Sequence, residues 1–436
     1  MKKLLIIAAL MMLATSAFAA VQNVKISGDI TTYGVGQYIY DLDDDIADVD
    51  PSNSLGDENN FFATITRLRV DADLTDNVAA TIRFANEREW DAACTSDSEA
   101  VQLDLAYITL KEIFYSPLTV TMGRQDLAYG SKLVIGDPNT NATVAADSNL
   151  NQAAYLSKMK AFDAIVGVLD YDPWTLDVVY AKIDETFEVN AEDVDVLGLN
   201  IAYDFADYEA EIEGYVFNVD GEKSSNAQDI TVYGLRGSLA PVDGLTVGGE
   251  IAIQTGDYSA TRSQDAMAAT VEGSYVWDNE YAPMVKLCYD YRSGEKAANT
   301  GDYEAWEPLY EDQTKGLIAD YLFSGVNGGV NSNASIISLS GSINPTEDLT
   351  IGIDWFNYTL DEKISASAIW SAPMLGQSIN TDKDDLGNEI DLTMTYDYTE
   401  DVVVGLQAGW FMPGDIFATA NDDDAYALVG SIAVSF

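Results

Sequence analysis

The segment AYALVGSIAVSF (residues 425–436) alternates between large apolar side chains and small ones. Side chains on a β-strand point alternately to its two faces, so the large residues would share one face and Ala and Ser the other. The large residues are Tyr426, Leu428, Ile432, Val434 and Phe436. A soluble sandwich would place charge on its second face, whereas small, weakly polar residues suit the inner wall of a membrane barrel. We therefore expect Phe436 to be a lipid-facing anchor on the closing strand.

The same alternation recurs along the chain. Two examples are FFATITRLRVDADL (61–74) and VAATIRFANEREW (78–90), and the chain contains eighteen such segments. Short turns and longer loops rich in Asp, Asn, Gly and Ser connect them in turn. An even strand number with short turns at one end and long loops at the other is typical of outer-membrane barrels. The sequence predicts an all-β fold: a transmembrane antiparallel β-barrel of about 18 strands, with short periplasmic turns and long acidic extracellular loops.

The N-terminal segment has the pattern of a secretory signal peptide. Lys2 and Lys3 precede an apolar run, and Ala17-Phe18-Ala19 is a small-x-small cleavage motif. We expect residues 1–19 to be a signal peptide and residues 20–436 to form an outer-membrane β-barrel. This predicts a protein of the cell outer membrane, secreted through the inner membrane.

The composition restricts the chemistry that the chain can perform. It has 72 acidic and 22 basic residues, so it repels nucleic acid. Histidine is absent, which removes His-dependent catalytic dyads and the commonest metal ligand. The two cysteines provide no metal or haem motif. We expect no enzyme activity, no metal site and no cofactor.

Facial alternation separates charged from large apolar side chains on strand after strand. Leu68 and Val70 lie on one face of their segment, whereas Arg69 and Asp71 lie on the other. A charge facing lipid at mid-bilayer would cost roughly 2–4 kcal/mol, so the charged faces should point inward. The predicted pore-lining residues are Arg67, Arg69, Asp71, Arg83, Glu87, Asp104, Glu209, Glu211, Glu213, Arg236, Glu250, Lys286, Asp290, Glu389 and Asp391.

Carboxylates outnumber Arg and Lys on this predicted inner wall, which favours a cation-preferring, water-filled pore. Alternatively, the same charges are only structural ion pairs that hold the wall together. Arg124 departs from the pattern, because the outward positions Leu118, Val120 and Met122 would send it toward lipid. A bulge at Gly123 or a position at the rim would resolve this conflict.

Two stretches and the terminal Phe together carry a family resemblance. LDLAYITLKEIFYSPLTVTMGRQDLAYGSKLVIGD (103–137) contains AY, GRQ, YG and IG in that order. GNEIDLTMTYDYTEDVVVGLQAGWFMPGDIF (387–417) joins a G-x-EIDL strand to one that ends in F-x-PG. This pattern resembles the alginate-export family of outer-membrane porins. The resemblance implies an eighteen-stranded monomeric barrel that carries small solutes or oligosaccharides by diffusion. Family members that export alginate have a basic lumen, whereas an acidic wall would repel a polyuronate.

The sequence thus predicts an outer-membrane porin for passive diffusion of small hydrophilic solutes, with ions and oligosaccharides as the candidates. The alternative is a surface barrel that acts as an adhesin, a receptor or a structural anchor. Expected partners are outer-membrane lipids, lipopolysaccharide, the solutes, and the barrel-assembly machinery through the strand ending in Phe436. The long loop at residues 299–333 would either fold into the mouth as a constriction or cover it as a cap.

Overall fold

The computed structural model describes residues 23–40, 42–43, 58–90, 101–138, 154–184, 193–223, 226–296, 301–323, 330–364, 379–418 and 422–436. The predicted signal peptide and Cys94 lie outside these ranges. No helix within them is long and apolar enough to span a bilayer.

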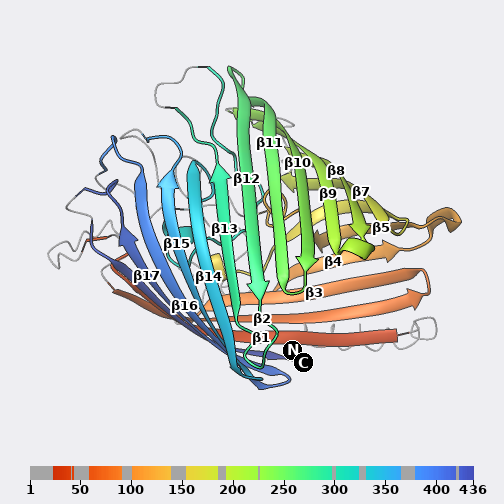
Figure 1. Cartoon of the computed structure of the whole chain (residues 1–436). Helices are drawn as coiled ribbons and strands as arrows, with labels where there is room; N and C mark the ends of the chain where they lie inside the picture. The colour runs from red at the N-terminus through yellow and green to blue at the C-terminus, as the bar shows by residue number, and fades with distance from the viewer. Residues whose placement is uncertain are drawn as a thin grey trace, which may run out of the picture.

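The described chain forms a single sheet of 18 antiparallel strands (Figure 1). The strands are β1 (Asn23–Tyr38), β2 (Glu58–Thr75), β3 (Val78–Glu89), β4 (Gln102–Leu110), β5 (Leu118–Asp126), β6 (Ala161–Asp170), β7 (Trp174–Asp184), β8 (Val194–Phe205), β9 (Ala210–Lys223), β10 (Asn226–Val242), β11 (Leu245–Ser259), β12 (Arg262–Val276), β13 (Met284–Arg292), β14 (Ala334–Thr346), β15 (Leu349–Leu360), β16 (Asp385–Thr399), β17 (Val402–Pro413) and β18 (Ala425–Ser435). The short helices are η1 (Ile113–Tyr115), η2 (Ala154–Leu156), η3 (Ala206–Tyr208) and α2 (Ala319–Leu322). The predicted fold class and strand number are confirmed.

The sheet closes between its first and last strands. β1 pairs with β18 from Asp29↔Ser435 to Tyr38↔Tyr426, and with β2 along its other edge. A closed sheet pairs its backbone groups internally, which is the condition for β-structure in hydrocarbon. Alternate residues of each strand therefore belong to the outer and the inner face of the barrel.

The connections differ between the two ends of the barrel. Tight turns such as 76–77, 243–244 and 400–401 lie at one end, together with both termini of the described sheet. Most connections at the other end are long, as expected. Two of them are hairpins instead, because β9–β10 and β11–β12 continue as paired strands until only residues 224–225 and 260–261 connect them. Local composition predicted longer loops at both places.

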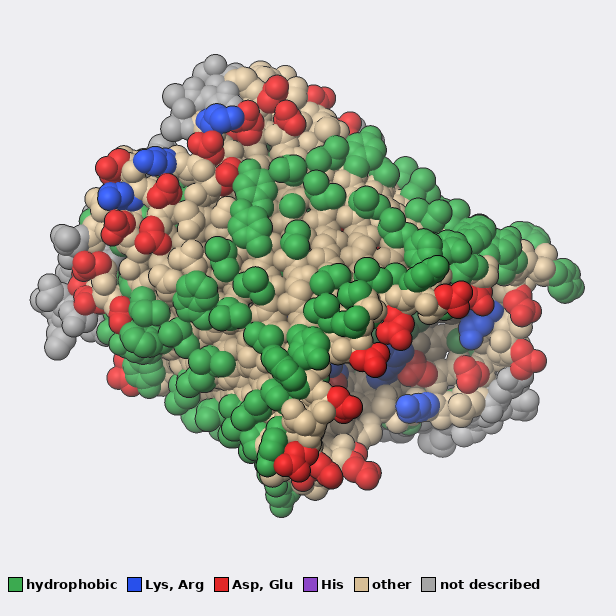
Figure 2. All heavy atoms as spheres, in the orientation of Figure 1, with side chains coloured by type: hydrophobic (Ala, Val, Ile, Leu, Met, Phe, Trp, Pro, Cys, Tyr) green, Lys and Arg blue, Asp and Glu red, His purple; other side chains and the backbone are tan. Residues whose placement is uncertain are grey.

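Large apolar side chains cover the outer face. Leu287 is 57% exposed and Leu392 is 51% exposed, although both lie in mid-strand. Figure 2 shows apolar side chains spread over the strands of this outer wall, with acidic side chains gathered toward its margins. Exposed Trp277 and Trp410 lie near strand ends, where aromatic residues of membrane barrels meet the bilayer interface.

Arg124 lies on the outer face of β5, as its place in the alternation requires. Its partner Asp163 lies 3.6 Å away. Both sequence neighbours of Asp163, Phe162 and Ala164, are buried on the inner face, so Asp163 lies on the outer face. The described pairs of β5 with β4 and β6 continue without a register shift, so Gly123 forms no bulge in this ladder. Arg124 lies near the loop end of β5. The rim position, with a carboxylate partner, resolves the conflict.

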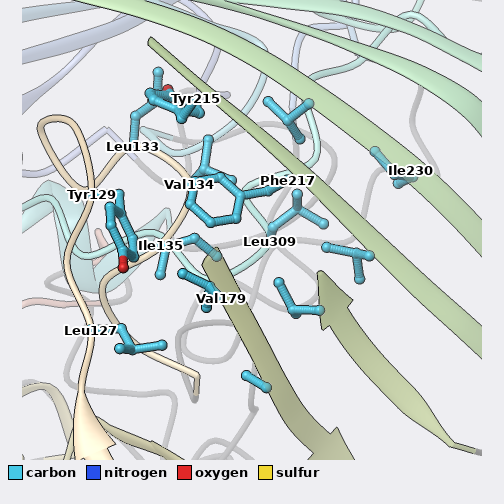
Figure 3. Packing of buried hydrophobic residues seen from close by; sticks show 14 of the residues in the cluster. Leu127, Tyr129, Leu133, Val134, Ile135, Val179, Tyr215, Phe217, Ile230 and Leu309 are labelled. Carbon is cyan, nitrogen blue, oxygen red and sulfur yellow. The ribbon is translucent and has the colours of Figure 1, made fainter. Parts of the chain in front are cut away.

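Two connections from the loop end fold back into the barrel. The β5–β6 loop (described at 127–138 and 154–160) and the β13–β14 loop (described at 293–296, 301–323 and 330–333) pack against inward-facing strand residues. Figure 3 shows Leu133, Val134 and Ile135 of the first loop beside Val179 and Phe217 of the wall. The described part of the second loop therefore occupies the interior, as a constriction would.

Candidate functional site in the barrel interior

An apolar cluster fixes the two inward loops against one side of the wall. Figure 3 shows Leu309 of the β13–β14 loop in the same cluster as residues of the β5–β6 loop. Inward residues of β6 to β12 complete it, and these members of the cluster are small or apolar instead of charged. A second apolar cluster packs the β13–β14 loop, through Leu322 and Phe323, against inward residues of β14 to β18 such as Tyr358 and Phe411. The interior thus combines two packed regions with a polar remainder.

Wall carboxylates also hold the β5–β6 loop through its backbone. Glu213 on β9 accepts a hydrogen bond from the Gly130 N–H (3.0 Å), and Glu250 on β11 accepts one from the Ser131 N–H (2.8 Å). The Tyr215 hydroxyl donates to Glu250 at 2.5 Å. Glu87 on β3 receives the Lys158 N–H at 2.7 Å. These carboxylates are nearly inaccessible to water, because the loop covers them.

The β13–β14 loop is anchored in the same way. Glu389 on β16 accepts hydrogen bonds from the Ile318 and Ala319 N–H groups at 2.7 and 2.8 Å. Asp391 accepts one from the Leu317 N–H at 3.0 Å. A carboxyl side chain presents two acceptor oxygens, so the Glu389–Asp391 pair can hold several successive backbone N–H groups of the loop.

An ion bridge connects the two loops. Asp312 of the β13–β14 loop binds Lys132 at 2.6 Å and also pairs with Lys160. Lys160 lies 3.9 Å from Asp137. Burial alone would raise the pKa of Asp312, but hydrogen bonds from the two lysines outweigh this effect and lower it. The bridge therefore carries a fixed pattern of charges between the loops.

The remaining polar wall is organised as ion pairs. Most join neighbouring strands, whereas Arg69–Asp71 lies within β2 and Lys315–Asp290 joins the β13–β14 loop to β13. The pairs are Arg67–Asp29 (3.0 Å), Arg69–Asp71 (2.8 Å), Arg83–Asp104, Arg236–Glu211 (3.4 Å), Lys286–Glu272 (2.6 Å) and Lys315–Asp290 (2.9 Å). Most of these groups are partly accessible, whereas Asp104 and Asp290 are buried. The wall thus offers paired charges of both signs to water.

A cavity of about 390 Å³ lies between the inward loops and the wall. Its charged lining includes Arg236, Lys286 and Lys315 on one hand, and Glu272, Asp312 and Asp354 on the other. Figure 2 shows a hollow at its lower right, where Lys, Arg, Asp and Glu side chains gather. An opening lined by charges of both signs can hold water and hydrophilic solutes.

The structure places fourteen of the fifteen predicted pore-lining residues on strands, with Glu209 as the exception. Glu209 was expected within a strand, but it lies in the tight turn after η3 with φ 46°, and β9 starts at Ala210. The strand residues divide into two groups. Arg67, Arg69, Asp71, Glu211, Arg236 and Lys286 are partly accessible, whereas Glu87, Asp104, Glu213, Glu250, Asp290, Glu389 and Asp391 are buried. Arg83 has an intermediate accessibility, with its side chain 12% exposed.

Sequence reasoning missed the loop residues of the site: Lys132, Lys160, Asp312 and Lys315. One signal was present. The chain has only 22 basic residues, yet the β5–β6 loop carries Lys132, Lys158 and Lys160. Lysines retained in the loops of so acidic a chain could have indicated an inward position beside carboxylates.

Solved structures from Pseudomonas aeruginosa have a similar fold. The outer membrane protein OprD aligns with a TM-score of 0.58 at 10% identity, over 95% of this chain and 94% of OprD. OccK8 (OprE) gives 0.59 at 10% identity, over 95% and 98%. OccK2 (OpdF), solved in complex with glucuronate, gives 0.59 at 12% identity, over 96% and 98%. At these identities the likeness establishes the porin fold alone.

No curated protein sequence matches the chain. The alginate export family, in contrast, matches residues 52–431, a range that includes β2 and ends within β18. This match covers most of the barrel and agrees with the resemblance of the AY, GRQ and G-x-EIDL motifs. The chain therefore belongs to the alginate export family.

Proposed function

We propose that this chain is an outer-membrane porin through which small hydrophilic solutes diffuse passively. The observation that carries the proposal is the opposition of the two faces of a closed sheet. Apolar residues such as Leu287 face outward, whereas the neighbouring Lys286 faces the interior cavity. A barrel with an apolar exterior and a charged interior can conduct water and ions across a bilayer.

The route to the membrane is part of the same proposal. Residues 1–19 would direct export through the inner membrane and then be removed. The strand that ends in Phe436 would be recognised by the barrel-assembly machinery. Lipids and lipopolysaccharide would surround the outer face.

We infer a modest cation preference. The chain has 72 acidic and 22 basic residues, so its summed potential attracts cations. Buried carboxylates such as Glu213 and Glu250 receive backbone N–H groups and add to this negative field. The accessible wall, however, presents Arg and Lys next to carboxylates. These pairs screen one another, which limits the preference.

Small sugars are suitable test solutes for this channel. OccK2 was solved with glucuronate, an anionic sugar, whereas the potential inferred here disfavours anions. We expect glucosamine and glucose to pass faster than glucuronate of similar size. A long polyuronate would be excluded both by charge and by the inward loops.

Liposome swelling with these three sugars tests the proposal. Mature protein that shows heat-modifiable gel mobility should permit swelling in glucose and glucosamine. Such protein without permeability to any of the three would contradict the porin proposal. Fastest entry of glucuronate would contradict only the inferred cation preference.

A further inference from the structure

A buried carboxyl group lies where the β13–β14 loop meets the wall. Glu307 is 6% exposed, and its Oε2 atom has no hydrogen-bond partner among the described residues. The backbone of Glu307 is held tightly: its N–H donates to Gln254 at 2.9 Å, and Gln254 donates to its carbonyl at 2.6 Å. The side chain thus enters a protein interior in which no described residue offers it a cation.

The surroundings of Glu307 are neutral or electron-rich. Gln264 on β12 has an Oε1 atom that is likewise buried without a partner among the described residues. A negative charge on Glu307 opposes the ionisation of three tyrosine hydroxyl groups: Tyr258 on β11 and the loop residues Tyr303 and Tyr310. Arg262, the cation near this end, is directed elsewhere. It binds Glu295 at 2.5 Å and the Gly301 and Asp302 carbonyl oxygens, and it lies 5.1 Å from the Tyr303 ring centroid.

An ionised carboxylate is unfavourable in such a place, because a buried charge requires a partner. A protonated carboxyl group, in contrast, carries no charge and requires no cation in such a place. Trp306 and Leu309, on either side of Glu307, are buried in the apolar cluster. The contact of loop and wall is therefore compatible with a neutral Glu307 and is weakened by a charged one.

We propose that the β13–β14 loop is a proton-sensitive constriction, in which uncharged Glu307 keeps residues 301–323 docked against β11 and β12, and loss of its proton releases them. This inference rests on the proposed channel function, because the released segment would widen the channel. The device needs no other ligand than the proton.

The sign of the pH dependence follows from burial. Burial raises the pKa of Glu307 from 4.5 to about 7, so the docked state binds more protons than the released state. Docking is therefore fully favoured below about pH 4.5 and weakens as pH rises toward 7. Within that window the ratio of docked to released loop falls by at most about tenfold per pH unit for one proton.

Glu311, four residues along the same loop, acts in the same direction. It is 4% exposed, and burial raises its pKa to about 8, with a further contribution from the negative charge of Asp320. Arg292 on β13 and the hydrogen bond from the Gln313 N–H oppose this rise, whereas Asp312 adds to it. Its titration would extend the loosening of the loop from pH 7 to pH 8.

Single-channel recording between pH 5 and pH 9 tests the proposal. Wild-type conductance should increase with pH, and Glu307→Gln, a permanently uncharged mimic of the acid, should keep the low-pH conductance up to about pH 7, above which Glu311 titrates. Glu304→Gln is the matched control. Glu304 lies on the same loop, but its carboxylate is accessible and pairs with Lys296 at 2.8 Å, so this variant should behave as wild type.

Trypsin cleavage after Lys315 reports release of the loop without reference to conduction. Lys315 is bound to Asp290 and its side chain is 14% exposed, so it is protected while the loop is docked. Cleavage at pH 8 should be faster in wild type and in Glu304→Gln than in Glu307→Gln.

The outcomes separate the two proposals. Equal cleavage of wild type and Glu307→Gln at pH 8, or identical pH profiles of conductance in protein with intact heat-modifiable mobility, would overturn the proton-sensitive constriction. If the wild type conducts at no pH between 5 and 9, while Glu307→Gln is cleaved more slowly than the wild type, the proton-sensitive docking of the loop is supported and the proposed channel function is contradicted. Failure of Glu307→Gln to assemble is addressed by Glu307→Met, which also lacks the charge and should be similarly protected.

Discussion

Gly28 and Phe436 join the two ends of the sheet. The Gly28 N–H donates to the Phe436 carbonyl at 2.9 Å, and the Phe436 N–H donates to the Gly28 carbonyl at 3.0 Å. A side chain at Gly28 would meet the Phe436 ring, because an added Cβ would lie 2.8 Å from it. The same Cβ would lie 2.6 Å from the Arg67 carbonyl oxygen. The last residue of the chain thus covers a position that only glycine accommodates.

We predict that Gly28→Val weakens barrel closure. Overpacking of this kind costs about 1–3 kcal/mol, and here one of the opposing atoms is backbone that cannot rotate away. The temperature at which the folded gel band converts to the unfolded one should fall. Gly430→Ala is the matched control, since no atom of the described residues lies within 4 Å of a Cβ at that position. Equal melting of the two variants would contradict this description of the closing seam.

We predict that Glu389→Gln loosens the β13–β14 loop. The variant replaces one of two oxygens that accept the Ile318 and Ala319 N–H groups by an NH₂ group, which repels a donor. A buried donor left without its acceptor costs about 1–3 kcal/mol, so the docked loop should lose much of its stability. Channel conductance should rise and trypsin should cleave faster after Lys315.

Glu347→Gln, in an exposed turn between β14 and β15, is the control for Glu389→Gln and should leave both readouts unchanged. A Glu389→Gln channel with wild-type conductance and wild-type protection of Lys315 would show that this carboxylate does not anchor the loop.

We predict that Lys132→Met increases cation selectivity. Removal of one lysine from Asp312 leaves the carboxylate less compensated, and the local potential becomes more negative. The reversal potential in a KCl gradient should shift toward that of potassium, whereas Asp312→Asn should shift it the opposite way. Lys182→Met changes a lysine that pairs with Asp195 at the outer rim and should have no effect. A shift toward chloride in Lys132→Met would contradict the proposed role of the ion bridge.

We predict that Leu287→Arg impairs assembly, whereas Ser340→Arg does not. Leu287 faces outward in the middle of β13, and Ser340 lines the cavity. An arginine that faces lipid costs roughly 2–4 kcal/mol at mid-bilayer, whereas one in the lumen remains hydrated. The fraction of heat-modifiable protein recovered from membranes measures the difference. Equal recovery of the two variants would be inconsistent with the assignment of inner and outer faces.

The sequence alone predicted the strand number and the division of the wall into two faces, because alternation is a local signal that repeats every two residues. Arg67 and Leu68 already show it within one strand. The outward position of Arg124 was likewise evident, but its partner Asp163 was not, because their pairing depends on the register between strands.

The internal loops could not be read in the same way. Glu389 and Glu250 looked like free pore charges, since nothing near them in the sequence indicates that Ile318 or Ser131 returns to meet them. Their burial follows from long-range packing of the β5–β6 and β13–β14 loops. Glu209 was misplaced for a local reason: the strand pattern extends beyond the residue at which the backbone turns.

Single-channel recording of the mature protein in a planar bilayer at neutral pH tests the central claim most directly. A closed sheet with a charged, water-filled interior predicts discrete, ohmic current steps in KCl, in preparations whose gel mobility is heat-modifiable. The same folded protein, inserted in the bilayer without any current steps, would show that the inward loops seal the barrel and would contradict its assignment as a porin.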